Sequence, residues 1–295
     1  MHPAPSVIAF STLSGAGFGL LFFLGLGVPE TRGLIAFTFY LLAYLLALGG
    51  IASAFFHLRN KRNAWRSYSQ WRTSWLSREA WAAVLALGVM GLHAAGQVFL
   101  GVTLAPLGWL GAALSLGTVL TTAMIYASLR AIPRWNQWAT PALYLAAALT
   151  GGSLLAGAFR VAPILLILLG AITLWHWWKG DRRLAEAGST TGTATGLDGR
   201  VRLWERPHTG ENYVTREMVF RIARKHALKL RAIAMTLMVA LPLLAVLVGG
   251  PHHLPAALAV ASHLAGVAVQ RWLFFAEAEH VVGLYYGAGE ARLQG

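Results

Sequence analysis

The chain has 295 residues, of which 57% are hydrophobic and only 12% are charged, and it carries a formal net charge of +13. Soluble domains usually contain about 25% charged residues, so this composition argues against an ordinary soluble protein. The absence of cysteine excludes disulfides and any iron–sulfur cluster ligated by cysteines of this chain.

The apolar residues fall in blocks long enough to cross a bilayer as α-helices, which needs about 20 residues. The short alternating segments of a transmembrane β-barrel are absent. We therefore predict an all-α integral membrane bundle of eight transmembrane helices, forming a single membrane domain over residues 1–295. The predicted spans are 6–28, 33–57, 79–101, 106–128, 140–159, 162–179, 231–249 and 258–286.

The first predicted span could be mistaken for a signal peptide. It has no basic residue before its apolar run, and the run is too long for a signal sequence. We therefore expect it to be a retained first helix.

The links between the spans divide into two sets. Four are short turns and lie on one side of the membrane. The other three, 58–78, 129–139 and 180–230, are long and lie on the opposite side with both termini. Within the last of these, residues 217–229 read as a basic helix that runs into the seventh span.

Positive charge is concentrated on the side of the long links. Of 24 Lys and Arg residues, Arg32 and Arg160 fall in short turns and Arg271 falls inside a span, which leaves 21 on the long-link side. Lys and Arg are retained on the cytoplasmic side. We therefore predict a multi-pass protein of the bacterial inner (cytoplasmic) membrane, with both termini and the 180–230 loop in the cytoplasm.

The same basic surface could contact a partner. No DNA- or RNA-binding motif accompanies the charge, so we expect no nucleic acid. Anionic lipid headgroups or an acidic protein surface explain it better. The residues that we predict to dock a partner are Arg59, Arg62, Arg66 and Arg72.

A first pair of ionisable residues lies where the second span ends and the third begins. These residues are His57 and Glu79. Ionisable groups at membrane depth are costly and usually functional. A histidine, which titrates near neutral pH, and a carboxylate can supply the hydrogen bonds and protons that a quinone head group needs. The alternative is a pair of interfacial residues that only anchor helix ends beside an aromatic belt.

A second cluster lies in the last predicted span. Glu277 and His280 are three residues apart and would share a helix face, while Arg271 would lie about 9 Å deeper. One interpretation is a structural ion pair that locks helices together. The other is a wall of the quinone site formed by Arg271 and His280, with Glu277 and Glu279 as a candidate proton path.

Three further histidines, His93, His176 and His263, lie in apolar spans. A bis-histidine haem would need two of them at matching depth. By residue count, His93 lies near the middle of the membrane and His263 near the outer face, so we expect no haem.

Four segments in order resemble the membrane anchor subunits of dimethyl sulfoxide reductase and its relatives. They are MHPAPSVIAFSTLSGAGFGL, SAFFHLRNKRNAWRSYSQWRTSWLSREA, MIYASLRAIPRWNQWATPALYLAAALTGGSLL and AGVAVQRWLFFAEAEHVVGLYYG. The resemblance covers most of the chain. Its motifs include the positions of His57, Glu79 and Arg271, which it marks as functional.

The resemblance implies a role in electron transfer. Anchors of this family bind a quinone or quinol, here ubiquinone or menaquinone, and use no haem. They hold an iron–sulfur electron-transfer subunit and a catalytic subunit with a molybdenum bis-pterin cofactor. The long 180–230 insertion is absent from the shorter anchors and is similar to the branch that includes the membrane subunit of sulfite dehydrogenase. Glu277 and Glu279 also differ from the short branch.

We therefore predict the quinone-binding anchor of a three-subunit molybdenum oxidoreductase, whose partner subunit oxidises sulfite while quinone is reduced. The alternative within the family is a quinol-oxidising anchor of a dimethyl sulfoxide-type reductase. Alternatives of another class are a transporter, which should show inverted repeats or broken helices, and a purely structural anchor.

Overall fold

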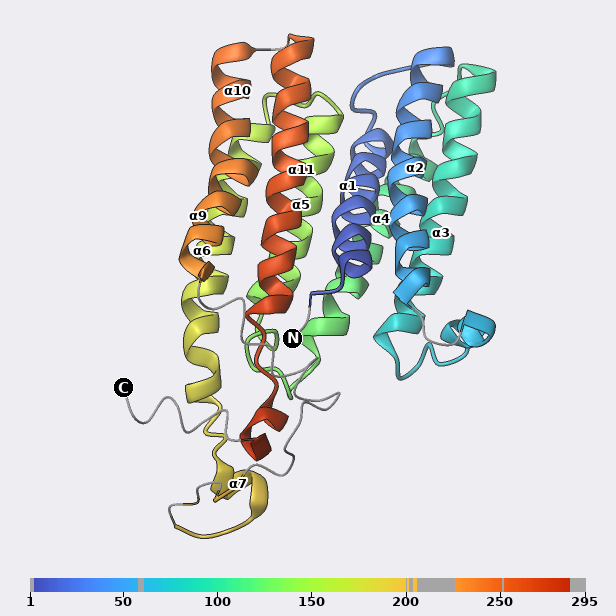
Figure 1. Ribbon diagram of the computed structural model, residues 1–295. Coiled ribbons are helices and arrows are strands. Elements are labelled where there is room, and N and C mark those ends of the chain that lie inside the picture. The colour runs from blue at the N-terminus through green and yellow to red at the C-terminus, as the bar shows by residue number, and fades with distance from the viewer. Residues whose placement is uncertain are drawn as a thin grey trace.

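The computed structural model describes residues 3–57, 61–199, 201, 204–205, 226–250 and 252–286. These residues form a bundle of long helices (Figure 1). In chain order the bundle helices are α1 (Pro5–Gly25), α2 (Gly33–His57), α3 (Trp75–Ala95), α4 (Ala105–Ala127), α5 (Ala139–Leu155), α6 (Ala162–Glu186), α9 (Ala227–Met235), α10 (Leu241–Gly249) and α11 (His253–Ala276). Two π-helical turns, η2 (Gly96–Leu100) and η4 (Thr236–Ala240), extend α3 and join α9 to α10.

Seven helices in the described part of the chain are long and apolar enough to cross a membrane. One of these seven is the continuous run Ala227–Gly249, which combines α9, η4 and α10. The eighth bundle helix, α5, has 17 residues and a length of about 26 Å at 1.5 Å per residue. The chain is thus an all-helical, multi-pass membrane protein, and α5 is shorter than a full span.

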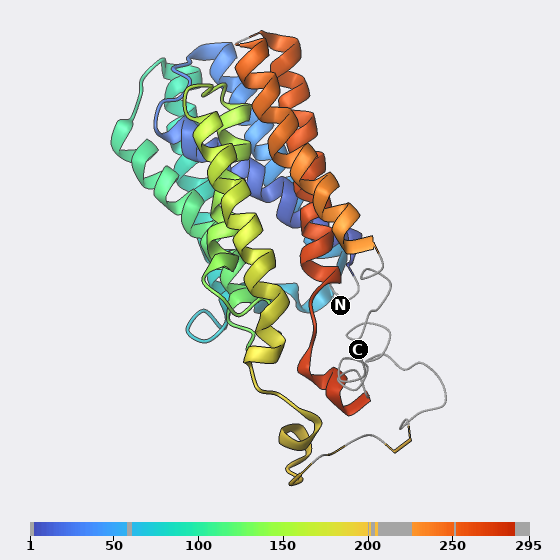
Figure 2. The ribbon, with the colours of Figure 1, turned by 90° about the vertical axis from the view of Figure 1, so that its left-hand side faces the viewer.

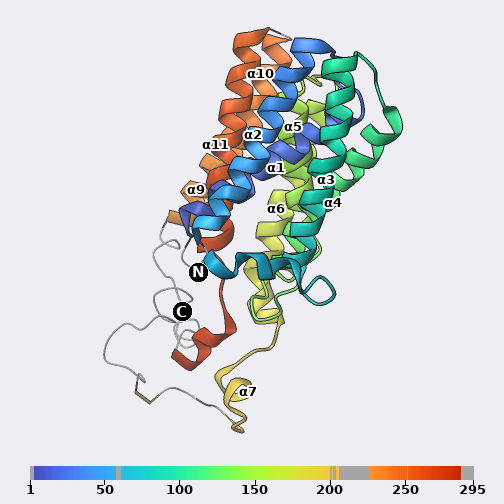
Figure 3. The same cartoon turned by 90° about the vertical axis from the view of Figure 1, so that its right-hand side faces the viewer.

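The ends of the helices follow the predicted division of the links. The short turns lie at one end of the bundle, and the connections after α2, α4 and α6 lie at the other, with the start of α1 and the end of α11 (Figures 1 and 3). We call this the long-link end. Beyond it lie two short helices, α7 (Thr191–Thr195) and η5 (Val281–Tyr286), which are joined by a hydrogen bond from the Tyr285 hydroxyl to the Ala194 carbonyl.

Helix α1 is the central helix of the bundle. In its most apolar stretch 67% of the residues are buried, against 28% in α2. Its small residues allow neighbouring backbones to approach closely, as is typical of membrane helices. A Cβ on Gly19 would lie 1.9 Å from the Ala148 carbonyl oxygen of α5, and one on Gly17 would lie 2.4 Å from the Ala47 nitrogen of α2. Figure 2 shows α1 running obliquely behind the helices of the second half of the chain.

The eighth predicted span is wrong at its C-terminal end. Helix α11 stops at Ala276, well before residue 286. Its last turn is followed by Glu277, whose carboxylate is held by two arginines from other elements. Glu277 and His280 therefore do not share a helix face. Most of the predicted basic helix 217–229 lies outside the described residues, and α9 begins at Ala227.

Candidate functional site

A pocket lies inside the bundle between α1, α4, α5 and α11. It is narrow and partly open, with free interior space on the scale of a water molecule. Its larger polar lining residues are Thr12, Thr122, Tyr144, His263 and Arg271, and the remaining wall is mostly small or apolar.

Among the described residues, Arg271 is the only charged one in the wall of this pocket. It lies on α11 and is 1% exposed. Its guanidinium carbon lies 3.5 Å from the centroid of the Tyr144 ring. This is a cation–π contact, and burial strengthens it. Its Nε and Nη1 atoms have no hydrogen-bond partner in the described part of the chain. A buried arginine normally has paired donors, so this guanidinium has room for an acceptor that none of the described residues provides.

Glu79 adjoins the pocket through Thr122. Glu79 is 8% exposed and lies one turn into α3, and the Thr122 hydroxyl of α4 donates to its carboxylate. The same hydroxyl lies 3.0 Å from the Thr118 carbonyl. Thr122 has one hydroxyl proton, which it can direct to either acceptor. An ionised Glu79 takes the hydrogen bond from Thr122, whereas a protonated Glu79 can donate to Thr122, which then donates to Thr118. The pair can therefore hold Glu79 in either protonation state.

Two stacked tyrosines connect Glu79 with Arg271. The rings of Tyr126 and Tyr144 are 5.7 Å apart, and each tyrosine lies within electrostatic range of both Glu79 and Arg271. A carboxyl group from α3 and a guanidinium from α11 thus share one neighbourhood at the same end of the bundle.

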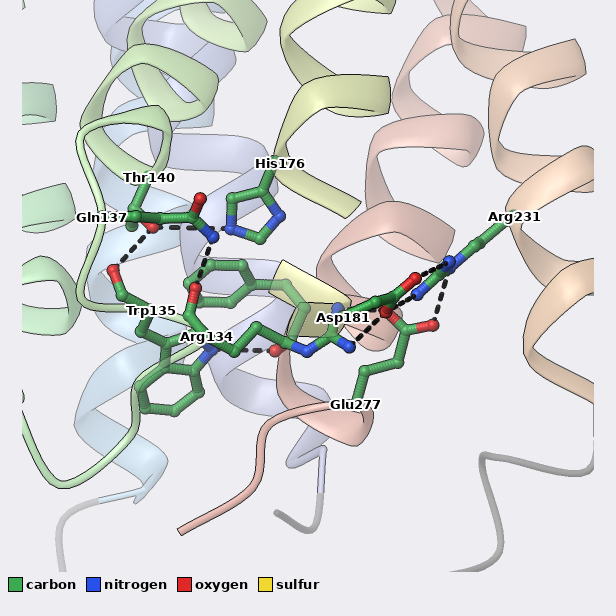
Figure 4. Close-up of polar contacts among 9 residues, drawn as sticks. Arg134, Trp135, Gln137, Thr140, His176, Asp181, Arg231 and Glu277 are labelled. Carbon is green, nitrogen blue, oxygen red and sulfur yellow. Dashed lines mark hydrogen bonds and ion pairs between the residues drawn. The ribbon is translucent and has the colours of Figure 1, made fainter. Parts of the chain in front are cut away.

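A second polar cluster lies nearer the long-link end and is shown in Figure 4. Arg231 of α9 contacts both Asp181 of α6, at 2.7 and 2.8 Å, and Glu277 at the end of α11, at 2.8 Å. Arg134 of the α4–α5 connection contacts the same two carboxylates, at 2.5 and 3.3 Å. We call these four alternating charges the ion-pair ring. It joins three helices and one connection.

The connection between α4 and α5 is fixed by further contacts. The Trp135 indole nitrogen donates to the Phe274 carbonyl at 2.9 Å, and the two rings stack 5.2 Å apart. The Thr140 hydroxyl donates to the Trp135 carbonyl at 2.7 Å. The ion-pair ring therefore lies in a tightly packed region, which favours a structural role for Glu277.

The structure brings together only part of the predicted site. Arg271 lines the pocket, and Glu79 adjoins it through Thr122. His57 is the last residue of α2, and its side chain is outside what the structure describes. His280 does not line the pocket, and its Nδ1 accepts a hydrogen bond from the Val282 backbone N–H at 3.0 Å. Glu279 lies half-buried in the segment after α11.

Three of the four predicted docking arginines lie in or near η1 (Lys61–Tyr68), at the edge of the long-link end (Figure 3). Arg62, Arg66 and Arg72 are exposed. The last two lie over exposed tryptophan rings, Trp65 and Trp71. The remaining predicted docking residue, Arg59, lies outside the described residues.

The three histidines of the spans have different surroundings. The Nδ1 atoms of His93 and His263 face the carbonyls of Leu104 and Met238, whereas the Nε2 atom of His176 faces the Thr140 hydroxyl. Across the described ranges, no group of three or more His, Cys, Asp or Glu residues could hold a metal ion.

Several site residues were not predicted from the sequence. Tyr144, Thr122 and Thr12 gave no signal, because single polar residues in apolar spans are common. Asp181 was visible as the one acidic residue in the basic segment KGDRR. A single acidic residue among basic ones in a helix could have indicated that Asp181 forms an ion pair, but not that its partners are Arg134 and Arg231.

Comparison with known proteins gives two matches. A family model described as "DMSO reductase anchor subunit (DmsC)" matches residues 1–168. A subunit of the sulfite dehydrogenase of Allochromatium vinosum is 34% identical to the chain over 328 residues, which cover 97% of this chain and 99% of that protein. No solved structure matches the chain.

Proposed function

The chain belongs to the DMSO reductase anchor subunit family, and on that premise we propose that it is the quinone-reactive membrane subunit of a molybdenum and iron–sulfur oxidoreductase. In this proposal an iron–sulfur subunit and a molybdenum bis-pterin subunit dock on the anchor. Electrons pass between the iron–sulfur subunit and a ubiquinone or menaquinone in the membrane.

The observation that carries the quinone proposal is the buried guanidinium of Arg271. It lines the pocket between α1, α4, α5 and α11, and two of its nitrogens have no hydrogen-bond partner among the residues that the structure describes. A quinone oxygen is an acceptor with the chemistry that these donors require. A structural ion pair, the alternative for this residue, would have left a carboxylate beside it.

The neighbouring residues supply the remaining chemistry. Reduction of a quinone takes two electrons and two protons. Arg271 would donate to one oxygen of the head group and stabilise negative charge there. Glu79 would hold the proton for that oxygen, with Thr122 between it and the pocket. The Tyr144 ring would keep the guanidinium in place.

The long-link end is the proposed docking face. Its connections carry most of the positive charge, and a basic face promotes encounter with an acidic partner and fixes its register. Glu79 and Arg271 lie in the half of the bundle next to this end, which keeps the path for electrons short. By the charge rule this end is cytoplasmic.

Single cysteines test this orientation cleanly, because the chain has none of its own. Cysteine at positions 30, 104 and 252 should react with an impermeant thiol reagent from outside, whereas cysteine at position 190 should not. Labelling of position 190 from outside would show that the orientation is opposite to the one proposed.

We propose sulfite as the substrate of the catalytic partner. The support is the similarity to the sulfite dehydrogenase subunit over nearly the whole chain, including the part beyond residue 168 that the family model does not match. The test adds sulfite and a short-chain quinone to the purified complex and follows quinone reduction. Quinone reduction with sulfite supports the assignment. No reduction by sulfite, together with rapid quinol oxidation by dimethyl sulfoxide, would replace it with the reductase alternative.

A further inference from the structure

We propose that His263 is the second polar contact of the quinone head group and exchanges a proton with the oxygen opposite Arg271. The proposal rests on the proposed quinone function and assigns a role to a residue that the sequence did not place in the site. Three observations carry it: a π-helical turn that fixes the imidazole, an unpartnered ring nitrogen in the pocket, and the placement of His263 relative to Arg271.

The seventh span contains the π-helical turn η4. A π-helical turn interrupts the regular backbone hydrogen bonding of an α-helix and often occurs at a functional site. Here two side chains of α11 contact the carbonyls of this turn. The Ser262 hydroxyl donates to Leu237 at 2.8 Å, and the His263 Nδ1 lies 2.9 Å from the Met238 oxygen. Gly266 permits the approach, because a Cβ there would lie 2.2 Å from the Met238 nitrogen.

The contact with Met238 sets the tautomer of His263. A carbonyl oxygen only accepts, so Nδ1 must carry the hydrogen, and a neutral imidazole then has a bare Nε2. That Nε2 atom is buried, lines the pocket and has no hydrogen-bond partner within the described ranges. The Ala147 carbonyl also lies near the imidazole ring. His263 is thus built to take up and release a proton at Nε2.

His263 and Arg271 lie toward opposite ends of the same pocket. They are eight residues apart on α11, a rise of about 12 Å. On the facing helix α5, Tyr144 contacts Arg271, and Gly151 faces His263, with a built Cβ 3.5 Å from Nε2. The two oxygens of a para-quinone point in opposite directions. A ring held between these groups would direct one oxygen to the Arg271 donors and the other to His263 Nε2.

Reduction of the quinone would consume two electrons and two protons. Two electrons enter from the reduced iron–sulfur subunit. One proton reaches the oxygen near Arg271 from Glu79, and the other leaves protonated His263 at Nε2, which returns to the neutral ring. In the reverse direction neutral His263 accepts the hydroxyl proton of the quinol.

The test uses the purified complex after its quinone has been extracted. Binding of decylubiquinone is measured by equilibrium dialysis, and its reduction by the dithionite-reduced complex is measured by stopped flow. His263→Asn keeps an amide donor near the position of Nδ1 and removes Nε2. His263→Gln keeps a polar group near the position of Nε2 that cannot carry a proton. His93→Asn is the matched control, because His93 is equally buried, faces a carbonyl at 3.0 Å and does not line the pocket.

We expect His263→Asn to weaken binding several-fold and to slow reduction by about 100-fold, the range of general acid–base catalysis. His263→Gln should recover binding but not the rate, and His93→Asn should reduce decylubiquinone as fast as wild type. Wild-type rates in His263→Asn, or equal losses in His93→Asn, would overturn the role of His263. If the wild-type complex binds no decylubiquinone, the quinone function itself fails.

Discussion

The ion-pair ring, which is buried at Glu277 and exposed at Asp181, and the buried Arg271 pocket are two polar clusters that differ in how their charges are satisfied. In the ring, Arg134 and Arg231 each contact both Asp181 and Glu277. In the pocket, Arg271 has a tyrosine ring beside it but no carboxylate contact, and two of its nitrogens lack partners in the described chain.

We interpret the paired charges of the ion-pair ring as structural and the unpaired charge of Arg271 as functional. Buried charges are normally paired, because removing an ion from water costs several kcal/mol. A charge without a partner is therefore expected where a ligand completes the site. The ion-pair ring joins the helices at the long-link end, whereas in our proposal the pocket provides hydrogen-bond donors to a quinone.

The largest expected effect comes from removing the unpaired charge. Arg271→Met should slow electron transfer to decylubiquinone by about 100- to 1,000-fold, the range for loss of an oriented donor. Its melting temperature after quinone extraction should equal or exceed that of wild type, because no ion pair is broken. Stopped flow and thermal unfolding of the purified complex measure both. A strongly lowered melting temperature would mean that Arg271 is structural.

The next effect concerns the proton carrier. Glu79→Gln should leave assembly intact and slow quinone reduction by about 100-fold, while transfer to an artificial dye continues. Thr122→Val, which removes the hydroxyl and keeps the shape, should have a smaller effect in the same direction. Normal quinone turnover in Glu79→Gln would place the proton route elsewhere.

Breaking the ion-pair ring should lower stability strongly and slow quinone reduction only a little. Glu277→Ala leaves two arginines with one carboxylate, and we expect it to lower stability by about 3 kcal/mol, as for other broken buried pairs. The rate of quinone reduction in the folded protein should fall far less than in Arg271→Met. Glu186→Ala is the control, because its pair with Lys179 is partly exposed and its loss should change stability little. A large loss of quinone reduction in Glu277→Ala at full stability would instead support the proton path.

The smallest effect is expected at His280, which lies in the segment after α11 and does not line the pocket. Burial lowers the pKa of His280, and its Nδ1 accepts a hydrogen bond that requires the unprotonated ring. Its stabilising contribution should therefore be present above the ordinary histidine pKa and be lost as the pH falls through the lowered value. Melting curves of wild type and His280→Gln should differ slightly at pH 7 and converge in acid. A gap that widens in acid would contradict this.

The sequence predicted most of the bundle, because the thickness of the membrane sets the length of the apolar segments and positive charge gathers in the links on one side. It also identified Glu79 and Arg271 as ionisable residues at depth. It could not predict that Arg134, Asp181 and Arg231 converge on Glu277, since they come from distant parts of the chain. Nor could it predict that α11 ends at Ala276, because that end depends on the same contacts. The proposed role of His263 depends on the π-helical turn η4, which periodicity does not indicate.

The central claim is that the pocket between α1, α4, α5 and α11 holds the quinone. An azido-quinone that is photolysed in the purified complex, followed by peptide mapping, tests it most directly. We expect label on peptides that contain residues 11–18 or 263–271, with loss of that label when decylubiquinone is in excess. Displaceable label confined to other peptides, such as those around Tyr40 and His93 at the opposite end of the bundle, would contradict it.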